Sequence, residues 1–340
     1  MAERELVTIT GANGYIAVHT IRLLLEAGYR VRGTLRDAAR GALIRAALAP
    51  LVDVSALDFA RADLASDDGW AAAMTGADYV IHMASPVPAE VPRREEELIA
   101  PAREGTLRVM GAAAAAGARR IVMTSSIAAV SSGHDKSRVF DESCWSDVTK
   151  DIGAYQKSKT LAERAAWEFI ESLAAEARPE FAVINPGFVL GPPIGGHAGA
   201  SLEVVRRLMA REVPGVPNMG FSLVDVRDVA AAHVIALTHP AAPGHRHICV
   251  SERMTFHEIA AHLAEHLGPD GYRIPTRRVP DAAVRLLALF SPTFRLIATR
   301  LGPATQYDTA RARETLGWQP RPMRRSLIDT ADSLRAQKIV

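Results

Sequence analysis

The residues most suited to chemistry are a tyrosine and a lysine four positions apart, in Tyr155-Gln156-Lys157-Ser158-Lys159. On a helix, positions i and i+4 share one face, so both side chains can reach the same substrate. A phenol with a pKa of about 10 is a poor proton donor or acceptor at pH 7 unless a nearby ammonium stabilises its phenolate. We therefore predict that Tyr155 acts as general acid and base, and that Lys159 lowers its pKa.

A serine at the end of a predicted strand completes this set. The run Arg120–Thr124 is followed directly by Ser125 and Ser126, and open parallel sheets bind ligands beyond the carboxyl ends of their strands. We favour Ser126 over Ser125 as the hydroxyl that holds the substrate oxygen. A Tyr-x-x-x-Lys match alone also describes a surface tyrosine beside a solvated lysine. Its combination with a strand-end serine and a glycine turn favours catalysis.

The glycine turn follows the first predicted strand, Leu6–Thr10, and opens a predicted helix over Tyr15–Glu26. Gly11 allows the tight turn, and Gly14 lets the backbone approach a pyrophosphate at the helix N-terminus, where unpaired N–H groups and the dipole favour negative charge. The spacing is Gly-x-x-Gly followed by Ala17, not Gly-x-Gly-x-x-Gly. We predict that a dinucleotide binds here; a glycine turn that binds nothing is the alternative.

The residue after the second predicted strand, Arg30–Leu35, indicates which dinucleotide binds. An acidic residue there hydrogen-bonds the ribose 2′-hydroxyl of NAD, whereas an arginine accommodates the 2′-phosphate of NADP. The chain has Arg36 followed by Asp37, and we favour Arg36 on the phosphate with Asp37 turned away. Arg40 is a candidate second contact. The alternative is that both arginines are solvated residues of a turn; the predicted cofactor is NADP(H).

The elements that must position these residues alternate through the first 190 residues, as β-branched runs and longer Ala- and Leu-rich stretches. This alternation is typical of a parallel sheet covered by helices on both faces, so we predict an α/β fold with a Rossmann-type doubly wound sheet. The predicted strands are Leu6–Thr10, Arg30–Leu35, Val54–Asp58, Tyr79–His82, Arg120–Thr124 and Phe181–Asn185. The predicted helices include Tyr15–Glu26, Gly105–Ala116 and Ala154–Ala174.

The composition changes after Asn185, where glycines and prolines crowd a loop that continues neither a helix nor a strand. We assign residues 1–190 to an NADP-binding Rossmann domain. Residues 220–250 are expected to return to it, with a helix over Val224–Leu237 and a strand over His247–Val250. Residues 191–219 and 251–340 are assigned to a smaller, mainly helical C-terminal substrate lobe.

Length, charge and cysteine content exclude several classes of protein. The 340 residues carry 40 Lys+Arg and 38 Asp+Glu, a net charge of +2 that argues against a nucleic-acid partner. Two distant cysteines, Cys144 and Cys249, favour a reducing compartment, and no leader peptide or membrane span is recognisable. We expect a cytoplasmic protein. Three arginines interrupt the apolar stretch Ala282–Leu301, which we interpret as amphipathic helices, with a lipid-facing or dimer-facing surface as the alternative.

Several histidines invite other interpretations. His262 and His266 fit a His-x-x-Glu-His zinc pattern, but no further ligand is evident and we predict no metal. His82 lies inside an apolar strand and is expected to be a hydrogen-bonded core histidine. His134 follows Ser131 in a loop near the predicted pocket and is a candidate substrate contact.

Taken together, the motifs resemble those of the extended short-chain dehydrogenases/reductases. The resemblance is to the branch that holds dihydroflavonol reductases, cinnamoyl-CoA reductases and microbial aldehyde and ketone reductases, and it extends over nearly the whole chain. The matching stretches are Thr10–Ile16, Val31–Asp37, Asp141–Asp147, Ser158–Glu163, Val224–Ala230 and Tyr307–Trp318.

The resemblance implies hydride transfer between nicotinamide and a carbonyl or alcohol carbon, with Ser126 polarising the oxygen, Tyr155 as general acid and Lys159 binding ribose. It implies that Asp63 and Leu64 border the adenine and that Ser201 is a phosphate contact. The full set of cofactor contacts that it implies is Gly11, Asn13, Gly14, Tyr15, Ile16, Arg36, Asp63, Leu64, Met83, Ala84, Ser85, Tyr155, Lys159, Pro186, Gly187, Val189 and Ser201.

Two departures from the branch bear on specificity. The plant reductases carry an asparagine five residues after the active serine that binds flavonoid hydroxyls, and this chain has Ser131 there. A lysine that helps to bind the 2′-phosphate is replaced by Leu43. The first departure argues against flavonoid specificity, and the second leaves Arg36 and Arg40 to supply the positive charge.

The predicted activity is NADPH-dependent reduction of an aldehyde or ketone. The pocket is expected to be formed by Val87–Val91, Ile127–His134 and the Gly/Pro-rich loop, which carry few charges and suit an apolar or aromatic small molecule. A hydroxysteroid dehydrogenase, a nucleotide-sugar epimerase or dehydratase, and a non-enzymatic NADP-sensing scaffold are the alternatives. The family resemblance implies a monomer or homodimer.

Overall fold

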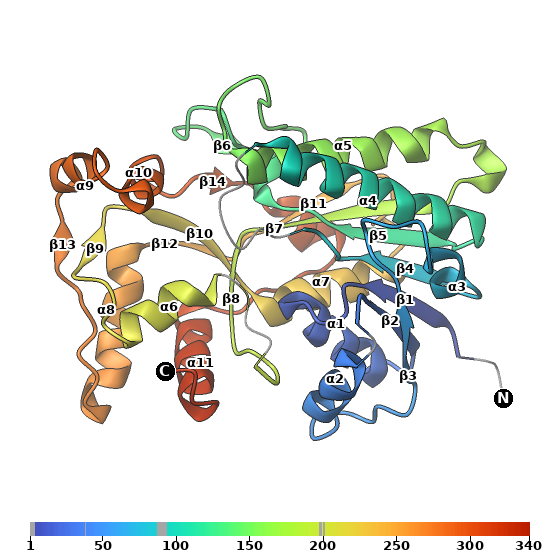
Figure 1. The fold of residues 1–340 in the computed structure, drawn as a ribbon, viewed down its shortest axis with the longest axis horizontal. Coiled ribbons are helices and arrows are strands. Elements are labelled where there is room, and N and C mark those ends of the chain that lie inside the picture. The colour runs from blue at the N-terminus through green and yellow to red at the C-terminus, as the bar shows by residue number, and fades with distance from the viewer. Residues whose placement is uncertain (1–3, 38, 87–93, 197–198, 200) are drawn as a thin grey trace.

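The computed structural model describes residues 4–37, 39–86, 94–196, 199 and 201–340. A seven-stranded parallel sheet forms the centre of one half of the molecule (Figure 1). In spatial order its strands are β11 (Arg246–Cys249), β7 (Glu180–Pro186), β5 (Arg120–Thr124), β4 (Tyr79–His82), β1 (Leu6–Thr10), β2 (Arg30–Leu35) and β3 (Leu57–Arg61). The predicted Rossmann-type sheet is confirmed.

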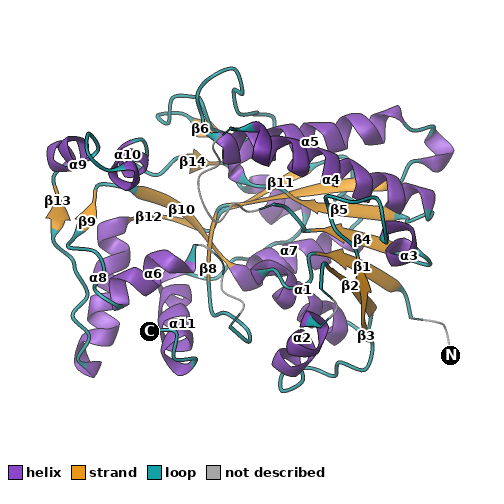
Figure 2. Cartoon of the chain, viewed as in Figure 1, coloured by secondary structure: helices purple, strands orange, loops and turns teal. Residues whose placement is uncertain are grey.

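Helices cover both faces of this sheet (Figure 2). One face carries α1 (Tyr15–Glu26), α2 (Arg40–Leu48) and α7 (Val226–Thr238), and the other carries α3 (Trp70–Met74), α4 (Glu96–Ala115) and α5 (Ala154–Ser172). The strand order reverses between β1 and β4, which both pair in parallel with their neighbours. Ligands of open α/β sheets bind beyond the carboxyl ends of the strands at such a reversal.

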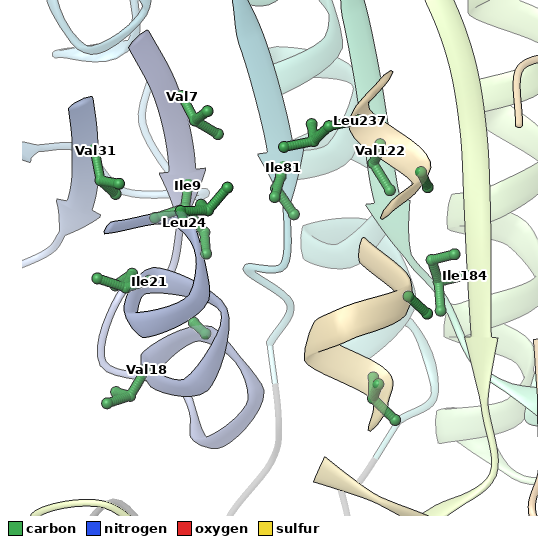
Figure 3. Packing of buried hydrophobic residues seen from close by; sticks show 14 of the residues in the cluster. Val7, Ile9, Val18, Ile21, Leu24, Val31, Ile81, Val122, Ile184 and Leu237 are labelled. Carbon is green, nitrogen blue, oxygen red and sulfur yellow. The ribbon is translucent and has the colours of Figure 1, made fainter. Parts of the chain in front are cut away.

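Side chains of the central strands alternate between two hydrophobic cores, as the period of two in a strand requires. Figure 3 shows Ile81, Val122 and Ile184 on the side of the sheet where α1 and Leu237 of α7 lie. The intervening Val80 and Ile121 belong to the core beneath α4 and α5. Both faces are therefore buried, which explains why these strands are almost continuously apolar.

A second, smaller half holds the remaining elements around its own core. Its strands β8 (Phe188–Leu190), β10 (Gly220–Asp225) and β12 (Glu252–Thr255) form a three-stranded sheet, and β9 (Val216–Pro217) pairs with β13 (Arg278–Val279). Its helices are α6 (Leu202–Met209), α8 (Phe256–Leu267), α9 (Asp281–Leu287), α10 (Pro292–Ala298) and α11 (Met323–Ala336). Residues 220–225 thus pair in the smaller sheet, whereas β11 joins the large one.

The chain crosses between the halves more than once. After α10 it runs along the small sheet, where Gly220 donates its N–H to the Gly302 carbonyl at 2.9 Å and Ser222 its hydroxyl to the Thr305 carbonyl at 2.6 Å. It then forms β14 (Gln306–Tyr307), which pairs with β6 (Val139–Phe140) beside the half that holds the large sheet. Short helical turns complete the description: η1 (Ile127–Ala129), η2 (Ala175–Ala177), η3 (Gly268–Asp270) and η4 (Arg311–Thr315).

Two predicted boundaries are wrong. The strand expected over Val54–Asp58 begins only at Leu57, because Asp53 caps a turn by accepting hydrogen bonds from the N–H and hydroxyl of Ser55. The helix expected from Gly105 begins nine residues earlier, at Glu96, and contains Pro101. Pro101 is the sixth residue of this helix, and it lacks the N–H of an interior hydrogen bond without ending the helix.

The apolar stretch Ala282–Leu301 forms α9, α10 and the turn between them. Leu289 and Phe290 in that turn are 68% and 81% exposed, and they are among the most exposed large hydrophobic residues of the described chain. Among the described residues there is no helix with the length and apolar character needed to cross a bilayer.

Candidate active site

The glycine turn lies at the reversal of strand order. Gly11 has a φ of +69°, and the N–H of Gly14 donates to the Gly11 carbonyl at 2.8 Å. A Cβ on Gly11 would lie 3.0 Å from the Ala84 Cα, so only glycine lets the turn approach the segment after β4. Gly14 offers α1 no side-chain cap. First-turn N–H groups are therefore available to a phosphate, and the turn fits a dinucleotide.

The segment opposite this turn is held by a threonine that sequence analysis missed. The Thr10 hydroxyl oxygen accepts the N–H groups of Met83 at 3.0 Å and Ala84 at 2.9 Å. Because this oxygen already accepts two hydrogen bonds, the Thr10 hydroxyl donates its proton to His82 Nδ1, 2.9 Å away. The neutral His82 ring therefore carries its proton on Nε2, which donates to the Thr106 hydroxyl. Burial lowers the pKa of His82 to about 3. The prediction of a hydrogen-bonded core histidine is confirmed.

The arginine predicted to bind the 2′-phosphate lies at the carboxyl end of β2. Arg36 and Arg40 are exposed, and neither side chain has a hydrogen-bond or ion-pair partner within the part of the chain that is described. The carboxylate of Asp37 instead accepts the N–H of Ala39 at 3.0 Å. Asp37 is therefore used in a local turn while both guanidinium groups remain available, which fits a phosphorylated ribose.

The two residues predicted to border the adenine follow β3. The Asp63 carboxylate accepts the N–H of Ala65 at 3.0 Å, and its carbonyl accepts the indole N–H of Trp70 at 3.0 Å. Leu64 packs toward Gly105 of α4, where an added Cβ would lie 2.7 Å from the Leu64 Cβ. These contacts fix the loop at the carboxyl edge of the sheet, where an adenine contact was expected.

Other predicted cofactor contacts make hydrogen bonds or close contacts within the protein. The Tyr15 hydroxyl donates to the Gly191 carbonyl at 2.6 Å, and the Ser201 hydroxyl donates to the Val189 carbonyl at 2.5 Å. Gly187 directly follows β7 and lies close to the small sheet. A Cβ added to it would lie 2.4 Å from the Ser222 carbonyl oxygen. Ile16 packs against the core beneath α1. Direct contacts of these side chains with a cofactor stay predictions.

The predicted catalytic residues meet where β5 ends and α5 begins. The Ser126 hydroxyl accepts the N–H of Ala128 at 3.1 Å and lies near enough to Tyr155 to oppose the rise in its pKa. Tyr155 is 39% exposed, so its ring is accessible from solvent. Ser125, in contrast, is buried and donates its hydroxyl to Glu163 at 2.5 Å. This arrangement supports the choice of Ser126 over Ser125.

The electrostatic surroundings of Tyr155 and Lys159 differ. The pKa of Tyr155 is raised, chiefly by desolvation of its hydroxyl, although the side chain as a whole is 39% exposed; Ser126 and Arg300 oppose this rise. Lys159 is itself buried, which lowers its pKa to about 8 against the opposing charge of Glu163. The charge of Lys159 also acts on His82. The predicted lowering of the Tyr155 pKa by Lys159 stays a prediction.

The substrate side of the cleft differs from expectation at two positions. The hydroxyls of Ser131 and Tyr307 hydrogen-bond each other at 2.5 Å, so Ser131 is already engaged by the segment that crosses from the smaller half. The His134 ring is 2.8 Å from the Trp145 carbonyl and packs on Phe140. The predicted wall at Val87–Val91 lies outside the described residues, and Ser85 is separated from that gap by Pro86 alone.

The histidines of the predicted zinc pattern belong to α8, away from this site. His266 Nε2 lies 2.9 Å from Asp332, and His262 lies 3.9 Å from Glu265 of the same helix. Within the described ranges, no group of three or more metal-ligating side chains is brought together.

Known proteins share this sequence and arrangement. Residues 7–250 match the model of the NAD dependent epimerase/dehydratase family. The chain is 38% identical to cinnamoyl-CoA reductase 1 of Arabidopsis thaliana, over 80% of this chain and 77% of that protein. It is 35% identical to the bifunctional dihydroflavonol 4-reductase/flavanone 4-reductase of Malus domestica, over 81% and 80%.

A solved structure extends the likeness to the whole fold. Yeast methylglyoxal/isovaleraldehyde reductase complexed with NADPH superposes with a TM-score of 0.80 at 27% identity, over 98% of this chain and 100% of that one. The family match covers the glycine turn, the strand-end serine and the Tyr-x-x-x-Lys helix described above. The chain therefore belongs to the NAD dependent epimerase/dehydratase family, among extended short-chain dehydrogenases/reductases.

Proposed function

We propose that this protein reduces an aldehyde or ketone to an alcohol with NADPH, using Ser126, Tyr155 and Lys159. The proposal depends on one observation. Ser126 and Tyr155 lie together at the edge of the sheet where the glycine turn also lies. At the coarser level, the chain is an NADPH-dependent oxidoreductase of its family, because its relatives are reductases and its structural neighbours include NADPH complexes.

The described residues fit NADPH at both ends of the cleft. Gly11 and the first turn of α1 would hold the pyrophosphate, and the exposed Arg36 would bind the 2′-phosphate. When bound, the nicotinamide supplies the hydride that forms the new C–H bond at the carbonyl carbon. The Lys159 ammonium makes no hydrogen bond to another described residue, so its three protons are available to ribose hydroxyls.

The chain's own residues supply the proton. Ser126 holds the carbonyl oxygen by hydrogen bonding, and the Tyr155 hydroxyl gives that oxygen its proton as negative charge develops there. The raised pKa of Tyr155 keeps the phenol protonated before the reaction. Tyr155 is re-protonated from solvent, to which it is 39% exposed, so one proton is consumed for each carbonyl reduced.

The substrate side suits an uncharged carbonyl compound with an apolar body. The predicted wall that begins at η1 holds the partly buried Ile127 and Ala128, and the nearby Ser131 is hydrogen-bonded to Tyr307. A substrate hydroxyl would have to displace Tyr307 to reach Ser131, which argues against a flavonoid. The relatives' names, cinnamoyl-CoA reductase and methylglyoxal/isovaleraldehyde reductase, support carbonyls of this general class.

The proposal is tested by following NADPH oxidation with aldehydes, diketones, ketoesters, flavanonols and steroids. We expect turnover with aldehydes or ketones and little with flavanonols. Absence of turnover with every carbonyl class would contradict the proposal. Purified protein that retains bound NAD and converts a sugar nucleotide would instead identify an epimerase or dehydratase.

A further inference from the structure

A buried carboxylate lies one helical turn beyond Lys159. Glu163 is fully buried on α5, four residues after Lys159. Its carboxylate accepts hydrogen bonds from the Ser125 hydroxyl at 2.5 Å, the Asn185 amide at 2.9 Å and Arg246 Nε at 2.5 Å. These three donors come from the end of β5, the end of β7 and the start of β11.

The guanidinium that balances this carboxylate is also buried. Arg246 is 6% exposed and lies face-on to the Trp145 ring, 3.9 Å from its centroid. Its other N–H groups donate to the carbonyls of Cys144 at 2.6 Å, Glu142 at 3.1 Å and Ala129 at 3.3 Å. Every acceptor but Glu163 lies in the chain between η1 and α5, so Arg246 fastens that loop to the sheet.

The amide in this cluster is oriented by its acceptors. Asn185 Nδ2 donates both to Glu163 and, at 3.3 Å, to the Ser126 carbonyl. The reversed amide would place its oxygen against two other oxygens. The observed orientation leaves Oδ1 buried without a partner among the described residues, at a cost that a purely stabilising arrangement would avoid.

The cluster connects the strand end that bears Ser126 to the helix that bears Tyr155 and Lys159. It holds the side chain of Ser125 and the carbonyl of Ser126, and its carboxylate residue, Glu163, lies on the same helix as Tyr155 and Lys159. The charge of Glu163 also opposes the lowering of the Lys159 pKa by burial. A buried ion pair is seldom a large net source of stability, because both ions lose their hydration. Its value here lies in fixed geometry.

We propose that Glu163 is a positioning residue, paired with Arg246, that fixes the strand end bearing Ser126 relative to the helix bearing Tyr155 and Lys159. The proposal rests on the proposed function, which assigns the reaction to those three residues. Loss of the carboxylate charge frees Ser125 and the Ser126 backbone to shift. Small displacements of reacting groups reduce the rate of the chemical step with little change in cofactor affinity.

The fold provides a matched control for the arginine. Arg120 is also 6% exposed, also begins a strand of the same sheet, and is paired with Glu180 at 2.6 Å. It likewise donates to two carbonyls, those of Ala236 and His239. It lies at the opposite end of β5 from Ser126. Loss of Arg120 therefore removes a similarly buried guanidinium, whose carboxylate partner Glu180 is exposed, without disturbing the catalytic end.

The experiment compares Glu163→Gln, Arg246→Met and Arg120→Met in the full-length protein. For each variant, melting temperature, NADPH affinity by fluorescence, and kcat and KM for a carbonyl substrate are measured. We expect Glu163→Gln and Arg246→Met to lower kcat between about 10- and 100-fold, with NADPH affinity changed by less than about threefold. We expect Arg120→Met to lower the melting temperature while kcat stays near the wild-type value.

Two results would overturn the proposal. One is Glu163→Gln with wild-type kcat, and the other is Arg120→Met with a loss of kcat as large as that of Arg246→Met. If the charge variants do not fold, Ser125→Ala removes a single donor to the carboxylate. It is expected to lower kcat by about three- to tenfold in a protein that stays folded, and unchanged kcat would contradict the proposal.

Crystal structures provide a readout that does not depend on turnover. The Glu163→Gln structure is expected to show Ser126 displaced relative to Tyr155, whereas the Arg120→Met structure keeps their separation. Failure of the proposed function is recognised separately, because Tyr155→Phe would then retain carbonyl reduction. If Tyr155→Phe is inactive and Glu163→Gln is fully active, only the positioning role is wrong.

Discussion

The two ends of the predicted cofactor cleft are built in opposite ways. At the catalytic end, Ser125 and Glu163 are buried in a cluster whose hydrogen bonds fix the residues around them. At the adenosine end, Arg36 and Arg40 stand exposed, without side-chain partners in the described ranges. Proton and hydride transfer depend on sub-ångström placement, whereas attraction of a phosphate needs only an available positive charge. The difference predicts that substitutions at the two ends will change different kinetic constants.

The largest effect is expected at the catalytic end, from Tyr155→Phe. Loss of the hydroxyl removes the proton donor, and general acids typically contribute 10²- to 10⁴-fold in rate, so we expect kcat to fall by about that factor. NADPH affinity, measured by fluorescence titration, should change by less than about threefold. Retention of most of the activity would show that another group supplies the proton.

At the adenosine end, Arg36→Ala should act on affinity alone. A hydrogen bond to a charged group contributes about 1.5–3 kcal/mol, which corresponds to an increase of about 10- to 150-fold in the KM for NADPH. The kcat at saturating NADPH and the KM for NADH should stay nearly unchanged. Equal increases in both KM values, or a wild-type preference for NADH, would contradict the assignment of Arg36 to the 2′-phosphate.

The pH dependence of cofactor binding sharpens the comparison, because the catalytic end contains a lysine whose pKa burial lowers to about 8. Lys159 loses its charge as the pH rises through that value, and charged donors make stronger hydrogen bonds than neutral ones. We expect NADPH affinity to weaken several-fold between about pH 7 and pH 9. Lys159→Met should bind NADPH more weakly and without this dependence; an unchanged dependence would point to a different group.

The same lysine affects stability in the opposite direction. Between pH values of about 8 and 10.5, unfolded chains retain a proton on this lysine that the folded protein has lost. The free energy of unfolding contributed by Lys159 therefore rises with pH in that window. Binding and stability thus separate, since alkaline pH weakens cofactor binding while it relieves the cost of burying the ammonium.

The smallest effect is expected from adding a charge at the adenosine end. Leu43 is 65% exposed on α2, at the position where related reductases are expected to carry a phosphate-binding lysine. Leu43→Lys should lower the KM for NADPH by about 1.5- to 5-fold, as an exposed ion pair of about 0.2–1 kcal/mol would. Leu51→Lys, at another exposed leucine, is the control for net charge and should leave that KM unchanged.

The sequence predicted those parts of the site whose residues lie close together along the chain. Tyr155 and Lys159 are one helical turn apart, and the turn at Gly11 directly follows a strand, so spacing alone predicted both. Partners distant in sequence were missed. Arg246 reaches Glu163 across 83 residues, and Tyr307 reaches Ser131 across 176. The sequence around these residues does not indicate which strand edge or loop the fold will bring to them.

The pKa of Tyr155 depends on burial and on a residue distant in sequence, Arg300, and the sequence predicts neither influence. Arg300 follows α10 in the smaller half, yet its charge acts on Tyr155. The prediction that Lys159 lowers the pKa of the phenol followed from helical spacing and the reference pKa of tyrosine, neither of which contains information on burial. Burial turned out to be the largest influence on both residues.

The late position of β11 has a consequence for how the protein is made. Among the described strands β11 pairs with β7 alone, so one side of β7 stays unpaired until Arg246 and the residues after it have left the ribosome. Until then the carboxylate of Glu163 has no guanidinium partner. The first half of the nascent chain can assemble the glycine turn and most of the sheet, but the catalytic end is among the last parts to acquire its final form. Chains that stop before Arg246 would therefore resemble the finished fold around the adenosine end and lack its chemistry.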